Sequence, residues 1–324
     1  MRNALITGGL GFVGKHFAKN LIEWNTYNKI HIVDKASAYS DIKFFNDFLA
    51  TKCELHVEDV KHFSLNDLGS ISRLDGLDIF HFAAESHVDR SFKNSIDFTV
   101  NNTEGTHHLL NALVKVPNHR LIMISTDEVY GEIAGKPVAE DAPFKPTNPY
   151  SASKAAADLL CQTYMTCFNL NCKIVRPNNI FGSRQHVEKL IPKTIQFARM
   201  GREFPLHGTG LQERSFLHVD DFCEALKKVV ATWDETSDRV FNVESFDRRR
   251  VCDLVETIYL RHGLSSTLLV ECDDRPFNDC AYHVSGEKLR QLGWQQIHSV
   301  DSVLEILIKQ ELFYGLGGRY ELKK

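Results

Sequence analysis

The chain has 324 residues, 43% of them hydrophobic and 25% charged, a composition typical of a soluble globular protein of about two domains. Its formal net charge of -4 and pI near 6.4 argue against a nucleic-acid-binding protein, which needs a positive surface. No apolar run approaches the length of a membrane-spanning helix, and a strand pattern begins at residue 3, so we expect a cytoplasmic protein without a signal peptide.

Short β-branched runs alternate with amphipathic helical patterns through the first half of the chain. Strands are predicted over 3–7, 29–33, 53–57, 78–82, 120–125 and 172–175, and helices over 14–24, 41–50, 101–115 and 150–167. This alternation predicts right-handed crossovers and a parallel sheet covered by helices on both faces. We therefore predict an α/β fold with a Rossmann-type, doubly wound parallel sheet.

After residue 176 the predicted elements become shorter and more mixed. Helices are predicted near 189–200, 250–262, 285–292 and 300–314, and strands near 214–219 and 240–243. We place one domain at 1–175 and a smaller α+β domain at 176–324, with segments that can interleave. No low-complexity linker separates them, so we expect a close-packed cleft between the two.

Cysteine and histidine spacing gives no signal for a metal centre. None of the eight cysteines forms a Cys-x-x-Cys pair, and most lie in apolar segments, as reduced core residues do. The adjacent His107 and His108 have no partner cluster at ligand spacing. We therefore predict no metal site. The basic run 248–250 predicts a helix start or a local anion contact.

The glycine-rich residues 8–14 (Gly-Gly-Leu-Gly-Phe-Val-Gly) lie between the first predicted strand and the first predicted helix. Gly9, Gly11 and Gly14 have the dinucleotide-binding spacing, and Gly8, Gly11 and Gly14 have its wider variant. Such a turn lets the backbone approach a pyrophosphate at the N-terminus of a helix. We expect Gly8, Gly11, Gly14 and the intervening Phe12 and Val13 to contact a dinucleotide.

Acidic residues after the second and third strands favour NAD as that dinucleotide. Asp34 ends the second strand 20 residues beyond Gly14, where a carboxylate accepts hydrogen bonds from ribose hydroxyls. An acid there would repel the extra phosphate of NADP, although Lys35 follows immediately. Asp59 and Val60, after the third strand, are placed to meet the adenine.

Residues 125–131 (Ser-Thr-Asp-Glu-Val-Tyr-Gly) directly follow the apolar run 121–124. In an open α/β sheet the ligand crevice lies at the carboxyl ends of the strands. A strand that ends in Thr126, Asp127 and Glu128 therefore places an acid and a base beside a substrate. A polar turn without a catalytic role is the alternative.

Tyr150 and Lys154 lie four residues apart at a predicted helix start, with Pro149 suited to the first turn. A nearby ammonium favours phenolate and lowers the pKa of a tyrosine toward neutrality, so this phenol could remove a proton from a hydroxyl group. The pairs Tyr39/Lys43 and Tyr320/Lys324 have the same spacing. We interpret them as surface pairs, because neither follows a polar strand end.

These residues together resemble the extended short-chain dehydrogenase/reductases, and within them the nucleoside-diphosphate-glucose 4,6-dehydratases. The matching segments are 83–91 (Ala-Ala-Glu-Ser-His-Val-Asp-Arg-Ser), 125–131 and 188–192 (Glu-Lys-Leu-Ile-Pro). Sugar epimerases of the superfamily typically carry small hydroxyl residues at 127 and 128, and UDP-glucuronate decarboxylases and GDP-mannose dehydratases usually carry Ser-Glu. The Asp-Glu pair therefore points to the glucose 4,6-dehydratases.

The nucleotide of the substrate is indicated by two further segments. Residues 275–279 (Arg-Pro-Phe-Asn-Asp) and 176–182 (Arg-Pro-Asn-Asn-Ile-Phe-Gly) are more similar to the UDP-glucose dehydratase domain of plant rhamnose synthases. Bacterial dTDP-glucose enzymes usually have Gly-His at 277 and 278. We favour UDP-glucose over dTDP-glucose, and a product that leads toward deoxysugars such as rhamnose.

The resemblance implies a cycle in which NAD is regenerated. Tyr150 takes the C4 hydroxyl proton as hydride passes to NAD, Lys154 holds the phenolate, and Thr126 hydrogen-bonds the C4 oxygen. Glu128 then removes the C5 proton, and protonated Asp127 donates to the leaving C6 hydroxyl, because repulsion between adjacent carboxyls splits their pKa values. The remaining implied contacts are Phe82, Ala83, Ala84, Tyr150 and Lys154 for NAD, and Ser86, Thr126, Asn179, Lys189, Leu190, Arg214 and Arg275 for the sugar nucleotide.

The family also implies a homodimer formed through the helices near 101–115 and 150–167. Two other functions stay open at this point: a UDP-sugar 4-epimerase of the same fold, and a non-catalytic NAD-binding protein. Complete sets of proton-transfer residues argue against the second, since a binding protein needs neither set.

Overall fold

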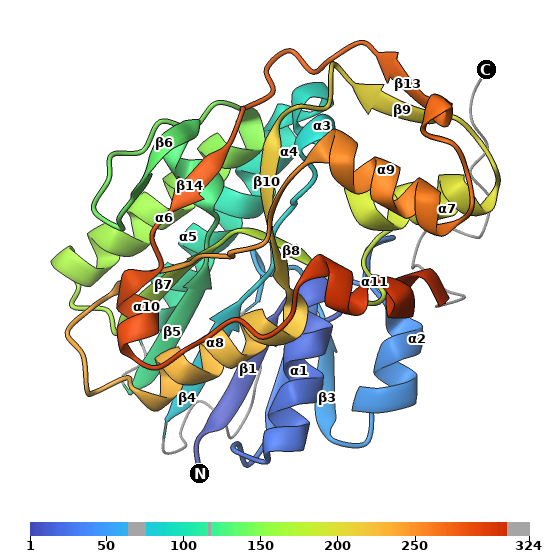
Figure 1. Ribbon diagram of the computed structural model, residues 1–324. Helices are drawn as coiled ribbons and strands as arrows, with labels where there is room; N and C mark the ends of the chain where they lie inside the picture. Colours follow the sequence, from blue (N-terminus) through green and yellow to red (C-terminus); the bar gives the residue numbers. More distant parts are fainter. Residues whose placement is uncertain (64–75, 116–117, 310–324) are drawn as a thin grey trace.

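A computed structural model describes residues 1–63, 76–115 and 118–309 (Figure 1). Its centre is a parallel sheet of seven strands in the order β11-β7-β5-β4-β1-β2-β3. The strands are β1 (Asn3–Thr7), β2 (Ile30–Asp34), β3 (Cys53–Val57), β4 (Leu77–His81), β5 (His119–Ile124), β7 (Cys172–Pro177) and β11 (Val240–Val243). The predicted Rossmann-type sheet is confirmed. Its strand order reverses between β1 and β4, where such sheets bind ligands.

Helices cover both faces of this sheet, and its strands other than the edge strand β3 are largely buried on both sides. One face packs against α1 (Phe12–Trp24), α2 (Ile42–Phe44) with its π-helical continuation η1 (Phe45–Leu49), α8 (Val219–Ala231) and α10 (Glu287–Gln291). The other packs against α5 (Gly105–Val114) and α6 (Pro149–Cys167). Phe17 of α1 and Phe222 of α8 are fully buried on the first face, and Cys161 of α6 on the second.

Two elements from the second half of the chain belong to the main sheet and the helices that cover it. β11 pairs with β7 at one edge of the main sheet, and α8 contacts α1. Segments beyond residue 176 are thus part of the main sheet and its helical layer, and the proposed division at 175/176 stays a prediction. Sequence analysis missed α8, although Phe222, Leu226 and Val229 follow helical spacing and Asp220 and Asp221 lie in its first turn.

The smaller region lies at the upper right of Figure 1, around α7 and α9. A third cluster of buried side chains forms its core. Its helices are α7 (Leu190–Arg199), α9 (Val251–Arg261) and α11 (Val300–Lys309), with the short η5 (Ser266–Leu268). Its strand pairings are β8 (Asn179–Phe181) with β10 (Glu213–His218) and β12 (Arg248–Arg250), and β9 (Phe204–His207) with β13 (Leu269–Cys272). A separate pair, β6 (Ile133–Val138) with β14 (Tyr282–Val284), packs in a fourth cluster with Val129, Tyr130 and Ala155.

The remaining helical segments lie before α5 and after β5. They are α3 (Val88–Lys93), α4 (Ser95–Phe98), the π-helical η3 (Thr99–Glu104) and the 3-10 turn η4 (Asp127–Tyr130). The basic run 248–250 forms strand β12, and α9 begins directly after it. The predicted helix 300–314 is described as far as Lys309, and its remainder lies outside the described residues.

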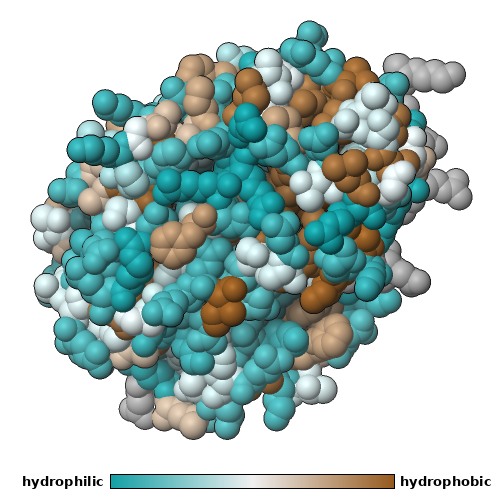
Figure 2. All heavy atoms as spheres, viewed as in Figure 1, coloured by the Kyte–Doolittle hydropathy of each residue, from teal (hydrophilic) through white to brown (hydrophobic). Residues whose placement is uncertain are grey.

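The face of the molecule in Figure 2 is mainly hydrophilic, with apolar side chains scattered and more frequent at the upper right. Within the described residues, no helix combines the length and apolarity needed to cross a membrane. All eight cysteines are free, with Cys53, Cys161, Cys172 and Cys223 buried.

Candidate active site

A cavity of about 500 Å³ lies at the carboxyl ends of the main-sheet strands, where the smaller region meets them. Every residue that sequence analysis singled out as a site residue lies in its wall. These are Gly8, Gly11, Phe12, Val13, Gly14, Asp34, Lys35, Asp59, Val60, Phe82, Ala83, Ala84, Ser86, Thr126, Asp127, Glu128, Tyr150, Lys154, Asn179, Lys189, Leu190, Arg214 and Arg275. The fold thus brings the proposed cofactor, acid–base and substrate residues into one space.

The glycine turn is packed so tightly that side chains would not fit. Gly8 has φ +69°, and a Cβ there would lie 2.6 Å from the backbone N of Ala83, in the loop that follows β4. A Cβ on Gly14 would overlap the carbonyl oxygen of Gly8 and lie 2.8 Å from the Cα of Gly9. No side chain caps the N-terminus of α1, whose first N–H groups can therefore bind an anion. These features fit a dinucleotide pyrophosphate.

We expect Gly14→Ala to weaken NAD binding and to destabilise the protein by about 1–3 kcal/mol, because backbone atoms must shift to admit the methyl group. Calorimetric titration with NAD and a thermal melt measure the two effects. Gly135→Ala in β6 is the matched control, since a Cβ there meets nothing within 4 Å. Unchanged NAD affinity in a folded Gly14→Ala protein would place the dinucleotide elsewhere.

Asp34 has a structural task in addition to its expected contact with ribose. Its Oδ2 accepts a hydrogen bond from the backbone N of Leu10 at 3.0 Å, and its Oδ1 accepts one from Ser40 Oγ at 2.8 Å. The carboxylate therefore ties the glycine turn to the loop after β2. Lys35 is turned toward Asn101, to whose Oδ1 its Nζ donates at 2.9 Å.

The polar end of β5 forms the 3-10 turn η4, which holds two carboxyl groups in the cavity wall. Thr126 caps this turn by accepting a hydrogen bond from the backbone N of Glu128 at 3.3 Å. Asp127 and Glu128 are only 2% and 7% exposed. Burial, followed by repulsion from Glu128, raises the pKa of Asp127 to about 7. Burial also raises the pKa of Glu128, so the pair can hold one proton near neutral pH.

Two asparagines that sequence analysis missed position these carboxyl groups. Asn178 Nδ2 donates to Asp127 Oδ2 at 2.6 Å, and its own Oδ1 accepts from the backbone N of Ser245 at 2.7 Å. Asn148 Nδ2 donates to Glu128 Oε2 at 3.2 Å, while the same side chain caps α6 through the backbone N of Ser151. An Asn directly before a Pro at a helix start was a detectable signal for Asn148.

α6 carries Tyr150 and Lys154, both almost fully buried. Sequence analysis predicted that Lys154 lowers the pKa of Tyr150 toward neutrality, and the structure contradicts this. Lys154 Nζ donates to the carbonyl oxygen of Ile124 at 2.6 Å. Burial, with repulsion from Glu128 and Asp127, raises the pKa of Tyr150 well above its ordinary value, and a hydrogen bond with Thr126 opposes that effect.

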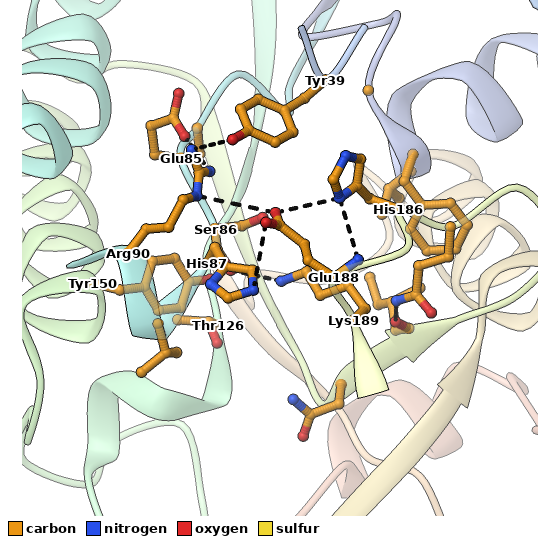
Figure 3. Close-up of a pocket in the computed structure, with 18 of the residues that line it drawn as sticks. Tyr39, Glu85, Ser86, His87, Arg90, Thr126, Tyr150, His186, Glu188 and Lys189 are labelled. Carbon is orange, nitrogen blue, oxygen red and sulfur yellow. Dashed lines mark hydrogen bonds and ion pairs between the residues drawn. The ribbon is translucent and has the colours of Figure 1, made fainter. Parts of the chain in front are cut away.

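Figure 3 shows Glu188 among basic groups in the wall that faces Tyr150. Its carboxylate lies 3.4 Å from His186 Nδ1, 3.7 Å from His87 Nε2 and 4.0 Å from Arg90 Nε. Burial lowers the pKa of both histidines to about 4, so they are neutral at pH 7. Sequence analysis assigned none of these four residues a role, because their contacts join α3 to the loop before α7.

Tyr39 belongs to the same wall, so its interpretation as part of a surface pair was wrong. Arg90 Nη1 donates to the Tyr39 hydroxyl at 2.8 Å, and the guanidinium lies 4.2 Å from the centre of the Tyr39 ring. The similar pair Tyr320/Lys324 lies outside the described residues.

Three cations gather at the end of the cavity formed by the smaller region. Lys189 Nζ donates to the carbonyl oxygen of Ser86 at 2.7 Å, and Arg214 Nη1 donates to that of Asp279 at 2.9 Å. Arg275 forms an ion pair with Asp89. The buried Oδ1 of Asn179 has no hydrogen-bond partner among the described residues. The N–H groups of the three cations suit a diphosphate group.

Comparisons with known proteins show the family of the chain. The sequence model of a family described as GDP-mannose 4,6 dehydratase matches residues 5–307. The chain is 38% identical to the Arabidopsis thaliana trifunctional UDP-glucose 4,6-dehydratase/epimerase/reductase RHM2 over 91% of its own length, and spans 45% of that protein. It is 34% identical to the dTDP-D-glucose 4,6-dehydratase of Bos taurus, with 91% of this chain and 84% of that protein covered.

A solved structure shows the same fold in detail. The dTDP-glucose 4,6-dehydratase DesIV from Streptomyces venezuelae, crystallised with NAD and TYD bound, superimposes with a TM-score of 0.88. The two proteins are 29% identical, and the match covers 95% of this chain and 96% of DesIV.

Proposed function

The chain belongs to the GDP-mannose 4,6-dehydratase family, and we propose that it removes water from a nucleoside-diphosphate glucose to give the 4-keto-6-deoxy sugar nucleotide. The observation that carries this proposal is the adjacent buried pair Asp127 and Glu128, in one cavity with Tyr150 and a dinucleotide-binding turn. An epimerase has no need of a second acid and base beside its tyrosine.

NAD is the proposed cofactor, held by the glycine turn, Asp34 and the residues after β3 and β4 that line the cavity. When bound, it accepts hydride from C4 of the sugar and returns hydride to C6. The fit rests on the absence of room for a Cβ at Gly8 and Gly14 and on the uncapped N-terminus of α1. Because the cofactor ends the cycle unchanged, we propose that it stays bound between turnovers.

Tyr150 is proposed to accept the proton of the C4 hydroxyl, with Thr126 bound to the C4 oxygen. Thr126 favours the phenolate form of Tyr150, because its hydrogen bond lowers the pKa of Tyr150 and so opposes the effect of burial. Lys154 supplies a buried positive charge one helical turn away, although burial lowers its own pKa to about 8. A ketone at C4 makes the C5 proton acidic, which glucose itself does not offer.

Glu128 and Asp127 are proposed to complete the elimination as base and acid. Glu128 removes the C5 proton, and Asp127 donates a proton to the C6 hydroxyl as water leaves. Glu128 then returns its proton to C5 when C6 receives the hydride. The higher pKa belongs with the acid role, because a carboxyl whose pKa is about 7 keeps its proton in part of the molecules at neutral pH. Glu128, held by Asn148, is the better base.

The rate of elimination should follow a bell-shaped pH profile. Above about pH 7 the rate falls, because Asp127 loses the proton that it must donate. At low pH the rate falls again, because Glu128 takes up a proton, and its raised pKa moves this limb above 4.5, the ordinary value for Glu. Measuring kcat against pH checks both limbs, which belong to the coupled pair. If kcat does not change as the pH passes through 7, Asp127 is not the general acid.

UDP-glucose is the proposed substrate, supported by the residues shared with plant rhamnose synthases at 275–279 and by the identity to RHM2. Incubation with UDP-glucose or dTDP-glucose, followed by mass spectrometry, tests function and nucleotide together. A dehydratase forms a product lighter by one water, and comparison of kcat/KM identifies the nucleotide. A product of unchanged mass that contains galactose would identify a 4-epimerase, and no product with either sugar nucleotide would favour a binding protein.

A cytoplasmic homodimer is also proposed. Exposed apolar side chains lie on the helices expected to form the interface, among them Val114 of α5 and Leu159 of α6, which are 42% and 52% exposed. Eight free cysteines suit a reducing compartment. Light scattering should give twice the mass of one chain, and a monomer would refute the dimer.

A further inference from the structure

A cluster of three potential metal ligands lies on β2 and β3, at the edge of the main sheet. His31 of β2, Glu54 and His56 of β3 each direct one ligand atom toward the others. The parallel register pairs His31 with Glu54, and side chains two apart on β3 share a face. None of the three lies in the wall of the catalytic cavity.

One ligand atom from each of the three residues lies within 4.8 Å of the other two, and the shortest contacts are close to the ligand spacing of a tetrahedral metal centre. His31 Nδ1 lies 3.2 Å from His56 Nε2 and 3.5 Å from Glu54 Oε2, and His56 Nε2 lies 3.8 Å from Glu54 Oε1. Bonds of 2.0–2.1 Å to a tetrahedral zinc ion place its ligands about 3.3 Å apart. Small side-chain movements, which the exposed Glu54 allows, would bring all three within bonding distance of one ion.

Burial makes His31 a preorganised ligand. Its side chain is 1% exposed, so the imidazole cannot turn away into solvent, and its Nδ1 is directed at His56. His56 is 21% exposed at its side chain and Glu54 61%, which leaves a path for an ion to enter. The buried Nε2 of His31 has no hydrogen-bond partner among the described residues. Because supporting hydrogen bonds strengthen metal sites about 10–100-fold, this site should bind less tightly than one that has them.

We propose that His31, Glu54 and His56 form a binding site for Zn²⁺ or a similar late transition-metal ion. Two imidazoles and one carboxylate are a ligand set that zinc uses with water in the fourth position. Nickel, copper and cobalt also prefer imidazole nitrogen, whereas Mg²⁺ and Ca²⁺ require more oxygen ligands. The ion would cross-link β2 to the edge strand β3. Sequence spacing could not reveal the site, because 23 residues separate the first two ligands.

The cross-link would affect the catalytic cavity only through the strands β2 and β3, because the metal ligands lie outside the cavity wall. Asp34 ends β2 three residues beyond His31, and the cavity-lining residues 58–60 follow β3. Metal binding should therefore stabilise the strands that carry the proposed nucleoside contacts. It is not required for the proposed dehydration, so either proposal can fail without the other.

The test uses tag-free, chelator-treated protein that retains its NAD. Calorimetric titration with ZnCl₂ should give one site per chain for the wild type, and Co²⁺ should give the visible spectrum of tetrahedral cobalt. His56→Ala and Glu54→Gln change partly exposed side chains, which keeps the fold intact. Each should weaken binding by at least about 10-fold and remove the rise in Tm that Zn²⁺ gives the wild type.

The control is His108→Ala, which removes an exposed histidine that has a Glu partner, Glu104, but belongs to no such cluster among the described residues. It should bind Zn²⁺ as the wild type does. Equal binding by the wild type and His56→Ala, or no binding by the wild type, would overturn the site. Loss of binding in His108→Ala alone would move it to α5.

Discussion

In the Asp127→Asn variant we expect oxidation at C4 to continue while loss of water slows by about 10²–10⁴-fold, the usual effect of removing a general acid. The amide has the shape of the carboxyl but cannot donate a proton to the leaving C6 hydroxyl. Reduced cofactor should therefore accumulate after mixing with substrate, which stopped-flow absorbance detects. Failure of reduced cofactor to accumulate would show that Asp127 acts before elimination and that the division of roles is wrong.

Glu128→Gln is the matched variant, because it makes the same chemical change at the neighbouring position. The two are distinguished by solvent exchange at C5 in D₂O. With Asp127→Asn, Glu128 still removes the C5 proton, so the recovered sugar gains deuterium. With Glu128→Gln that exchange should be lost. Exchange in Glu128→Gln and none in Asp127→Asn would reverse the assignment of acid and base.

Tyr150→Phe should lose oxidation and dehydration together, with kcat/KM lower by about 10²–10⁴-fold. The ring remains and still packs against that of Phe98, with 6.3 Å between the two ring centroids, so α6 should keep its position. Without the hydroxyl, the group that is proposed to accept the C4 proton is missing. Single-turnover measurements should then show no reduced cofactor, in contrast to Asp127→Asn.

Tyr164→Phe is the control for this variant, because it makes the same change further along α6. Its hydroxyl contacts Asn111 and His107, and Tyr164 is not in the cavity wall. Its loss should cost about 1 kcal/mol of stability and leave kcat unchanged. If Tyr150→Phe keeps full activity, the phenol is not the base.

The main sheet could be predicted because its strands are short, apolar and separated by amphipathic helices. The strands β6, β8, β9, β12, β13 and β14 were missed because they pair in twos and threes and are partly exposed. Their residues show neither a long apolar run nor a regular alternation. β12 is the extreme case, since three arginines form it through pairing with β10 and ion pairs to nearby acids.

The site residues could be predicted where all residues of a motif lie close together in the sequence, as in residues 8–14 and 126–128. Asn178 could not be predicted, because its partner Asp127 lies 51 residues away and only the fold brings them together. The state of Tyr150 could not be predicted either. Helical spacing predicts that Lys154 lies on the same face as Tyr150, but it does not predict the direction of the ammonium group. In the structure that group donates a hydrogen bond to the carbonyl oxygen of Ile124, at the end of β5.

β11 reaches the sheet long after its neighbour β7 during synthesis on the ribosome. About 60 residues separate the two strands, so at typical translation rates β7 waits roughly 3–13 s for its partner. Throughout that time a strand whose side chains are all buried in the finished protein has an open edge. The nascent chain is therefore exposed to aggregation at this edge while residues 178–243 are being made, and holding chaperones should bind it then.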